Sequence, residues 1–139
     1  MRVFDVAVEV IKQGGRRRGA NMGVLHVSHP DIFGFIEAKT SEGPLRNFNL
    51  SVSVPDRFME DRKIDLINPR TGETVDSVPS REIFRRIVKA AWRSGDPGMI
   101  FEDRINRRNP TPSLGRIEAT NPCISSDTLI MTSEGPLPV

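Results

Sequence analysis

The sequence has very little cysteine and no long apolar run. Its one cysteine, Cys123, excludes a disulfide framework and any zinc site built from cysteines, and it fits a reducing, cytoplasmic setting. No apolar segment approaches the roughly 20 residues of a membrane span. Arg2, Asp5 and Glu9 interrupt any signal-peptide core at the N-terminus. We therefore expect a protein without a membrane partner or a secretory segment.

A strong charge of one sign is also missing, and aromatic residues are few. The 139 residues include 20 Lys and Arg against 18 Asp and Glu, and aromatic residues make up 6%. Proteins that coat nucleic acid usually have a larger basic excess, and single-strand binding uses aromatic side chains for stacking. A small RNA-binding domain is therefore disfavoured, and no nucleic acid is expected among the partners.

Alternating apolar patterns predict an α/β fold in a chain long enough for one domain. Ser28 and Ser80 are expected to cap helices, and the second of these helices should end at Gly95. Its predicted core stripe consists of Ile83, Phe84, Ile87, Val88 and Ala91. The expected elements are helices at 2–13, 28–39 and 80–94, a short helix opened by Pro55, strands at 24–27, 47–54 and 99–101, a hairpin at 65–78, a loop at 106–116 and two short strands after residue 123.

A loop rich in glycine and arginine follows the first helix. Glycine lets backbone N–H groups approach an anion, and arginine offers paired donors to phosphate. The segment matches neither a Walker A loop nor a dinucleotide-binding fingerprint, so a solvated basic loop is the alternative. Its candidate site residues are Lys12, Gln13, Gly14, Gly15, Arg16, Arg17, Arg18, Gly19, Ala20 and Asn21.

Three further features could carry chemistry. The polar face of the strand 47–54 either lines a polar cavity or is an exposed sheet face. His26 and His29 lie three residues apart without an acidic framework, so surface or structural roles are expected and no metal site is predicted. Cys123 is either a small buried residue or a nucleophile.

Residues 1–122 resemble the catalytic chain of ribonucleotide reductases, most closely the adenosylcobalamin-dependent (class II) branch. The matching segments occur in the family's order along the chain. They are Val10-Ile11-Lys12-Gln13-Gly14-Gly15, Arg17-Arg18-Gly19-Ala20-Asn21-Met22-Gly23, His29-Pro30-Asp31-Ile32, Asn47-Phe48-Asn49-Leu50-Ser51-Val52, Gly95-Asp96-Pro97-Gly98 and Arg116-Ile117-Glu118-Ala119-Thr120-Asn121-Pro122-Cys123.

This resemblance implies a part of a ten-stranded α/β barrel that makes deoxyribonucleotides by thiyl-radical chemistry. Asn121 would bond the ribose hydroxyls, and Cys123 would occupy the position of the radical cysteine. The family's Glu two residues further on is replaced by Ser125. Residues 12–23 match the specificity loop, which lies between a dNTP effector and the ribonucleotide substrate. The resemblance further implies a homodimer, with helix 2–13 in the interface, and a cobalamin site that is not in this chain.

From Cys123 onward a second resemblance begins. Residues 123–139 are similar to the N-terminal splicing block of a hedgehog/intein-type domain. They share its initial Cys, Asp127-Thr128, Ile130, Thr132 and Gly135. In such proteins the first cysteine attacks the preceding carbonyl, here that of Pro122.

We therefore expect two parts, a reductase barrel fragment over 1–122 and a truncated intein segment over 123–139. Both ends of the chain match internal positions of the two families, so a piece of a longer protein is expected, inactive by itself. The substrate could be a ribonucleoside diphosphate or a triphosphate. The alternative is a stand-alone nucleotide-binding regulatory module without catalysis.

Overall fold

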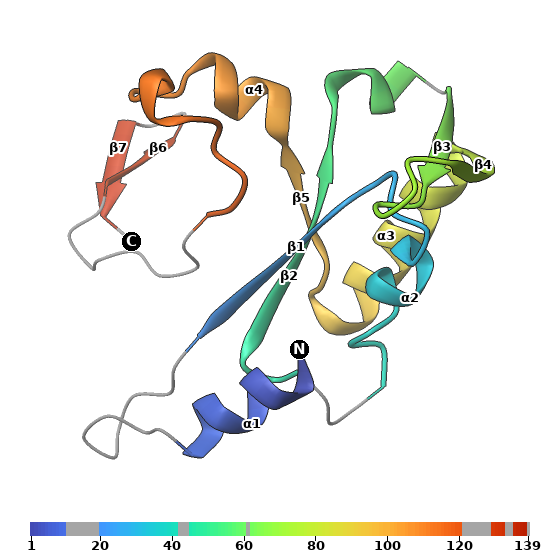
Figure 1. Cartoon of the computed structure of the whole chain (residues 1–139). Coiled ribbons are helices and arrows are strands. Elements are labelled where there is room, and N and C mark those ends of the chain that lie inside the picture. Colours follow the sequence, from blue (N-terminus) through green and yellow to red (C-terminus); the bar gives the residue numbers. More distant parts are fainter. Residues whose placement is uncertain (11–19, 42–44, 61, 121–128, 133–134, 139) are drawn as a thin grey trace.

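A computed structural model describes residues 1–10, 20–41, 45–60, 62–120, 129–132 and 135–138, the last two ranges as backbone only. Figure 1 shows the arrangement of the elements. The helices are α1 (Arg2–Val10), α2 (Ile32–Ile36), α3 (Ser80–Ser94) and α4 (Glu102–Arg107), with 3-10 turns η2 (Asp56–Glu60) and η3 (Pro112–Leu114). The strands are β1 (Asn21–His26), β2 (Phe48–Val54), β3 (Lys63–Ile67), β4 (Thr74–Pro79), β5 (Gly98–Phe101), β6 (Leu129–Thr132) and β7 (Gly135–Pro138).

A parallel sheet of β1, β2 and β5 forms the centre, with β2 between the other two strands (Figure 1). Helices lie in the connections between these strands, because parallel neighbours cannot be joined by a tight turn. The α/β prediction is therefore confirmed. The residues described here form this sheet and two hairpins, and they do not close a barrel.

The two antiparallel hairpins agree with the sequence pattern. β3 and β4 pair from Lys63 opposite Pro79 to Ile67 opposite Thr74, which confirms the hairpin predicted around residues 68–72. β6 pairs with β7, which confirms the two short strands predicted after Cys123. Two paired strands occur in many folds, so the intein-type domain stays a prediction.

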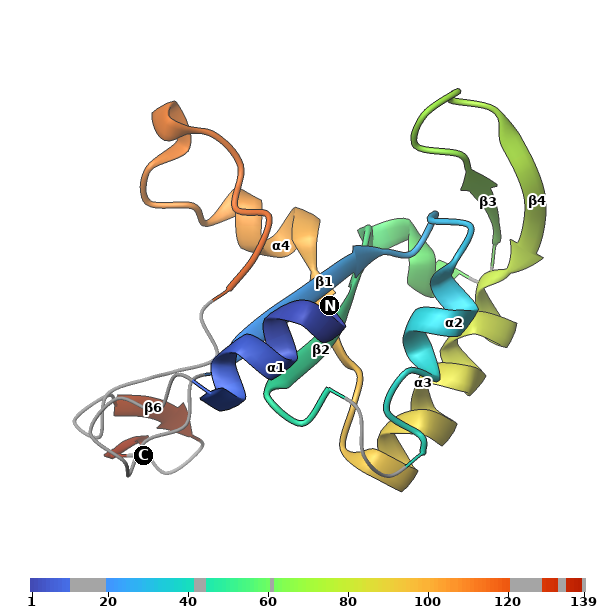
Figure 2. The ribbon, with the colours of Figure 1, turned by 60° about the horizontal axis from the view of Figure 1, so that its bottom comes forward.

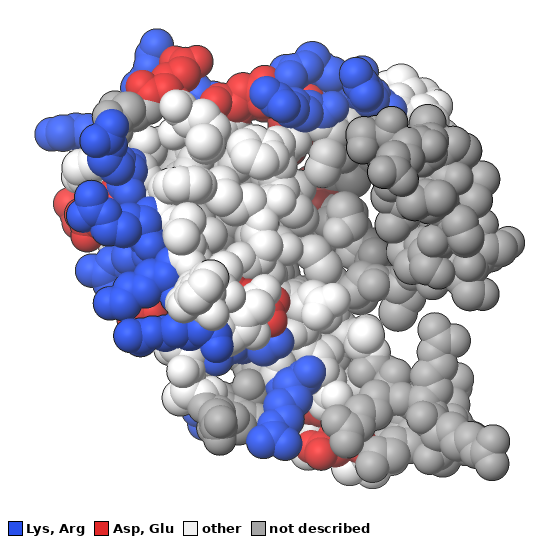
Figure 3. Space-filling model, turned by 180° about the vertical axis from the view of Figure 1, so that it is seen from behind, with Lys and Arg blue, Asp and Glu red and all other residues white. Residues whose placement is uncertain are grey.

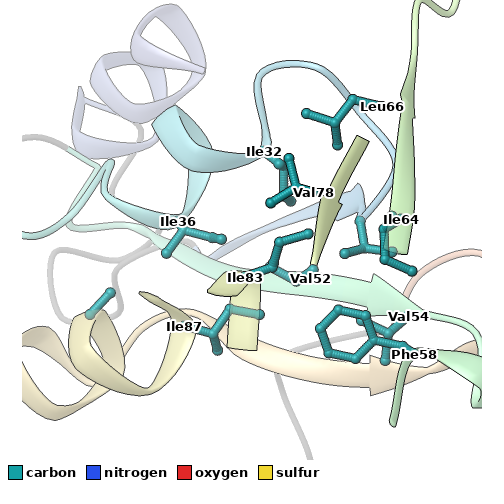
Figure 4. Packing of buried hydrophobic residues seen from close by; sticks show 12 residues of the cluster. Ile32, Ile36, Val52, Val54, Phe58, Ile64, Leu66, Val78, Ile83 and Ile87 are labelled. Carbon is teal, nitrogen blue, oxygen red and sulfur yellow. The ribbon is translucent and has the colours of Figure 1, made fainter. Parts of the chain in front are cut away.

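The main core lies between the sheet and helices α2 and α3, which pack side by side on one face (Figure 2). Figure 4 shows how the buried side chains converge there. The cluster consists of Val27, Ile32, Ile36, Val52, Val54, Phe58, Ile64, Leu66, Val78, Ile83, Ile87 and Ala90. α3 contributes Ile83, Ile87 and Ala90. Phe84 and Val88, predicted to share this stripe, are exposed instead, because each lies about 100° round the helix from its buried neighbour.

Several predicted boundaries are wrong. β1 begins at Asn21 rather than Val24, because pairing with β2 supplies its backbone bonds although Asn and Gly are poor strand formers. Neither Ser28 nor Ser80 caps a helix through its side chain. The helix expected over 28–39 is only the short α2, and α4 occupies residues where a loop was expected from 106. Gly95 does end α3, in the left-handed conformation with φ of 80°.

β2 is covered on both faces in its carboxyl-terminal half. Its apolar side chains point into the core, as the alternation predicts. On the other face Ser51 and Ser53 are only 8% and 7% exposed, although Asn49 is exposed. The interpretation of this face as a simple exposed sheet face is therefore wrong for the carboxyl-terminal half of the strand.

An ion pair between Lys39 and Asp96 joins three parts of the fold. The Lys39 Nζ lies 2.6 Å from the Asp96 Oδ2 and also donates to the Phe48 carbonyl at 2.6 Å. The Asp96 Oδ1 accepts the Leu50 N–H at 2.9 Å. Both charged side chains are 16% exposed. The pair therefore fixes the α3–β5 turn and the segment after α2 to β2.

α1 lies near the amino-terminal ends of β1 and β2 (Figures 1 and 2), and polar contacts of Asp5 hold it there. It buries none of its side chains. The Asp5 carboxylate accepts the Leu45 N–H at 2.8 Å and the Asn47 N–H at 3.1 Å, and the Asn47 amide donates back to the Asp5 carbonyl at 3.2 Å. Asp5 is therefore the main tether of this helix among the contacts of the described residues.

Replacing Asp96 with alanine should lower the free energy of unfolding by about 3–4 kcal/mol, because it leaves a buried ammonium and an unpaired Leu50 N–H. Urea unfolding of the chain measures this change. The control is Glu60→Ala, which breaks an exposed pair with Arg62 and should cost less than about 1 kcal/mol. Equal losses in the two variants would contradict the role assigned to the buried pair.

Replacing Asp5 with alanine should detach α1 without unfolding the sheet, because the helix has no buried side chain to hold it. Heteronuclear NOE values for Val3–Val10 should fall to those of a flexible chain, while those of β2 stay high. Glu9→Ala, on the same helix, serves as the control. Unchanged NOE values in Asp5→Ala would show that α1 is held by something else.

Candidate functional site

The predicted loop residues lie partly outside the described structure. Ala20 is exposed, and Asn21 is the first residue of β1. The remaining predicted site residues, Lys12, Gln13, Gly14, Gly15, Arg16, Arg17, Arg18, Gly19, Asn121 and Cys123, are outside the described residues. What the structure shows is how the two ends of the loop are held.

Both ends of the loop are fixed to Asn47. The Asn21 N–H donates to the Asn47 carbonyl at 2.7 Å, which fixes the point where the chain enters β1. The Asn47 amide and backbone bind Asp5 in α1, the helix from which the loop departs. Asn47, just before β2, therefore binds the elements on both sides of the segment 11–20, α1 through Asp5 and β1 through Asn21.

The side chain of Asn21 is left with an unused donor. Its Nδ2 is buried and has no hydrogen-bond partner among the described residues. A buried donor without an acceptor costs about 1–3 kcal/mol. Asn21 is thus the one predicted loop residue whose described surroundings call for an additional acceptor.

A hollow of about 480 Å³ lies beside Asn21, between α1 and β1. Its wall is largely apolar, with Met1, Phe4, Phe35 and Phe48 among the lining residues. Gly23 also faces it. A Cβ on Gly23 would lie 3.0 Å from the Leu50 Cδ2, so glycine allows this close packing of β1 on β2.

A second polar cluster lies at the carboxyl ends of the three strands. Ser53 Oγ donates to Glu102 Oε2 at 2.7 Å, and Glu102 Oε1 lies 3.4 Å from His26 Nε2. On its other side His26 Nδ1 accepts the Ser28 N–H at 3.2 Å and lies 2.7 Å from the Ser28 hydroxyl. The Nδ1 lone pair is therefore engaged, and the neutral imidazole carries its proton on Nε2, directed at Glu102.

Sequence reasoning missed this cluster. Glu102 lies between the predicted strand 99–101 and the predicted loop 106–116, and Ser53 lies on the polar face of the predicted strand 47–54, so no local pattern brings them together. The available signal was topological, because the carboxyl ends of parallel strands meet at one edge of a sheet. His26 has a structural partner on each ring nitrogen, and His29 Nδ1 accepts the Asp31 N–H at 3.1 Å, as expected for structural histidines.

The segment that leads to the Asn-Pro-Cys motif is attached beside this cluster. The Asn106 side chain in α4 accepts the Ile117 N–H at 2.8 Å and donates to the Ile117 carbonyl at 3.1 Å. It also donates to the Glu102 carbonyl at 2.9 Å. Asn121 follows Ile117 by four residues. The segment that leads to it is therefore anchored to α4, next to the carboxyl end of β5.

Neither a metal-binding cluster nor a membrane-spanning helix occurs among the described residues. Across residues 1–10, 20–41, 45–60 and 62–120, no three His, Cys, Asp or Glu side chains are grouped to hold a metal ion. None of the described helices is long and apolar enough to span a bilayer.

Comparison with known proteins identifies the family. The model of the ribonucleotide reductase barrel domain matches residues 1–126. A vitamin B12-dependent ribonucleoside-diphosphate reductase of Thermoplasma acidophilum is 52% identical over 128 residues, which cover 88% of this chain and 17% of that protein. The Mycobacterium tuberculosis enzyme of the same name is 53% identical over 130 residues, covering 88% and 18%. A putative reductase large subunit of Frog virus 3 is 31% identical over 115 residues, covering 77% and 20%.

The chain thus spans less than a fifth of the length of the two most similar of these relatives. The matched region includes both ends of the glycine- and arginine-rich loop, the ion pair between Lys39 and Asp96, and the segment that leads to Asn121. The chain therefore belongs to the ribonucleotide reductase family and carries a part of its barrel domain.

Proposed function

We propose that this chain is part of an adenosylcobalamin-dependent reductase that converts ribonucleoside diphosphates to deoxyribonucleotides. The observation that carries the proposal is the 52–53% identity, over 88% of the chain, to relatives named vitamin B12-dependent ribonucleoside-diphosphate reductases. The same names favour a diphosphate over a triphosphate substrate. A stand-alone regulatory module is less well supported, because the matched region belongs to the catalytic barrel domain.

In this proposal the segment predicted as a specificity loop, residues 12–23, lies between a dNTP effector and the substrate, and its last three residues belong to β1. The contacts of Asn47 support it, because a loop fixed at both roots can change shape between them without moving the sheet. The unsatisfied Asn21 Nδ2 supports it as well, since a loop carbonyl or a bound nucleotide could supply the acceptor. Arginines 16–18 would pair with phosphate oxygens.

The catalytic positions in this proposal are Asn121 and the cysteine position at 123. Asn121 would bond the ribose hydroxyls, and a cysteine thiyl radical at position 123 would take the hydrogen from C3′, forming an S–H bond and a substrate radical. Ser125 cannot replace the family's acid/base glutamate, so the sequence that follows position 123 must differ in the active enzyme. The Asn106–Ile117 contacts support a fixed approach to this site.

Adenosylcobalamin supplies the radical that such enzymes pass to the cysteine. The described residues do not fit this cofactor. A hollow of about 710 Å³ among them is a groove with a strongly cationic wall along α3, and His26 already has a polar partner at each ring nitrogen. We therefore place the cofactor site in a part of the enzyme outside this chain.

A homodimer is proposed to form through α1. Val3, Val6 and Val10 are all exposed and share one side of this helix at spacings of three and four residues. The loop departs from the carboxyl end of α1. A second copy packed on this helix would therefore bring an effector at the interface close to the loop.

The loop assignment is tested with Arg17→Ala and Gln13→Ala in a full-length reductase that carries this segment. Each variant should change which effector favours which substrate more than it changes the highest rate. Loss of one charge-assisted contact, about 1.5–3 kcal/mol, sets an upper limit of about 10- to 150-fold on the change in preference. Arg70→Ala, on the β3–β4 turn, is the control. Equal rate losses for every effector and substrate would rule out the assignment.

We also propose that Cys123 begins a protein-splicing element. The Cys123 sulfur would attack the Pro122 carbonyl carbon, so that a C–S bond forms, the peptide C–N bond breaks and the Cys123 nitrogen takes a proton. Thiolates suit this exchange because they are strong nucleophiles and good leaving groups. The β6–β7 hairpin supports the proposal as the expected start of such a domain. After splicing, the first residue of the following segment would supply the radical cysteine.

The splicing proposal predicts that Cys123→Ala blocks ligation in a polypeptide extended through the complete intein and the following reductase segment. Precursor should accumulate, and any remaining cleavage should occur only at the downstream junction. Gel analysis with mass spectrometry distinguishes these products, and Ser126→Ala is the control. A Cys123→Ala protein that still yielded reductase of normal length would contradict the proposal.

A further inference from the structure

Helix α3 has an apolar stripe that nothing in the described structure covers. Phe84, Val88 and Trp92 follow one another at four-residue spacing, so their side chains lie along one side of the helix. They are 38%, 51% and 90% exposed. The buried side of α3, with Ile83, Ile87 and Ala90, is already packed on the sheet. The exposed stripe is therefore additional to what the fold requires.

The stripe extends beyond the amino end of the helix. Met59 in η2 is 56% exposed, and it lines a small hollow of about 140 Å³ together with Phe84, Phe58 and Arg81. Met59 is a flexible side chain that adapts to irregular surfaces. The apolar surface thus runs from η2 to the last turn of α3 and ends in a shallow socket.

A cationic stripe runs beside the apolar one. Arg81, Arg85, Lys89 and Arg93 also repeat every four residues, and they line a groove of about 710 Å³. Figure 3 shows a ridge of Lys and Arg side chains at the edge of the molecule where α3 lies. The ridge is a continuous strip of positive charge about 18 Å long, at 1.5 Å of rise per residue.

Most of this positive charge is not neutralised within the described chain. The two carboxylates of the groove, Glu37 and Glu82, both lie beside Arg86, at 3.0 Å and 3.6 Å. Among the described residues no ion pair is formed by Arg85, Lys89 or Arg93, whereas Arg81 has an interaction of its own. The groove therefore keeps an excess of cations next to an apolar stripe.

We propose that α3 is a docking surface for an acidic amphipathic helix. The partner's apolar side chains would cover Phe84, Val88 and Trp92. Its Asp or Glu residues, repeated every four positions, would face Arg85, Lys89 and Arg93. Charge complementarity excludes a second copy of α3 as the occupant, because two such cationic strips repel each other. A nucleic acid would use the cations but leave the aliphatic part of the stripe in water.

The relatives contain long segments beyond the matched region, and such a helix can lie in one of them. They are more than five times longer than the region that matches this chain, so the partner can belong to the same longer polypeptide. The proposal does not depend on the reductase reaction, since it rests on exposure, spacing and charge alone.

Trp92 is the only tryptophan of the chain, so its fluorescence reports on the stripe directly. The probe is a helical peptide with Leu at spacings of three and four residues and Glu on both flanks. Its twin has Lys in place of Glu. The Glu peptide should shift the Trp92 emission to shorter wavelength in a saturable way. Its affinity should fall with added salt and should exceed that of the Lys twin.

Charge reversal makes the test specific. Arg85→Glu/Lys89→Glu should lower the affinity for the Glu peptide by about tenfold or more and raise the affinity for the Lys twin. Arg2→Glu/Arg70→Glu, an equal charge change at two residues that do not line the groove, should leave both affinities unchanged. Circular dichroism of each variant shows that the fold is intact.

Three results would overturn the proposal. They are no blue shift with the Glu peptide, equal binding of the two peptides, and tighter binding of a single-stranded oligonucleotide than of the Glu peptide. Preserved binding of the Glu peptide by the Arg85→Glu/Lys89→Glu variant would also contradict it.

Discussion

Strand β2 is paired along both edges and covered on both faces from Ser51 to Val54, and the other elements are arranged around it. Its edges pair with β1 and β5, Val52 and Val54 lie in the core under α2 and α3, and Phe48 and Leu50 form a second buried cluster with Leu45. The Lys39–Asp96 pair adds a charged clamp, because Asp96 binds the Leu50 N–H while Lys39 binds the Phe48 carbonyl. Two buried charges are costly when separated, so this clamp keeps the α3–β5 turn in one position against the strand. The regions with proposed functions depend on that position.

The two ends of β2 serve the two proposed functions of the chain. At its amino end Asn47 binds both sides of the proposed specificity loop, through Asn21 on one side and Asp5 on the other. At its carboxyl end Ser53 binds Glu102, whose helix holds the segment that leads toward the Asn-Pro-Cys motif. A rigid central strand therefore lies between a loop that should change shape and a motif that should be held still. This division would suit the regulated enzyme proposed above, since substrate choice and radical chemistry require different mobility.

The sequence predicts the elements with clear periodicity and fails where tertiary contacts decide. The alternation of 47–54, the hairpin at 65–78 and the end of α3 at Gly95 are visible in local patterns alone. Asn21 and Gly23 lie in a strand only because β2 pairs with them, and no local propensity favours this. The His26–Glu102 contact joins residues 76 positions apart, so only the parallel topology could have indicated it. The roles predicted for the loop residues and for Cys123 come from motif resemblance alone. Hydrophobic periodicity predicts helices and strands, and it carries no information on chemical function.

The most direct test of the central role of β2 is native-state hydrogen exchange of this chain, followed by NMR at each amide. Amides from Leu50 to Val54 should exchange most slowly, with opening free energies close to that of global unfolding, because both strand edges and both faces are protected. The amides of α1 should exchange much faster, since that helix buries none of its side chains and its main tether is Asp5. If β2 instead exchanged as fast as α1, or α1 were as well protected as β2, the account of a sheet organised around one central strand would be wrong.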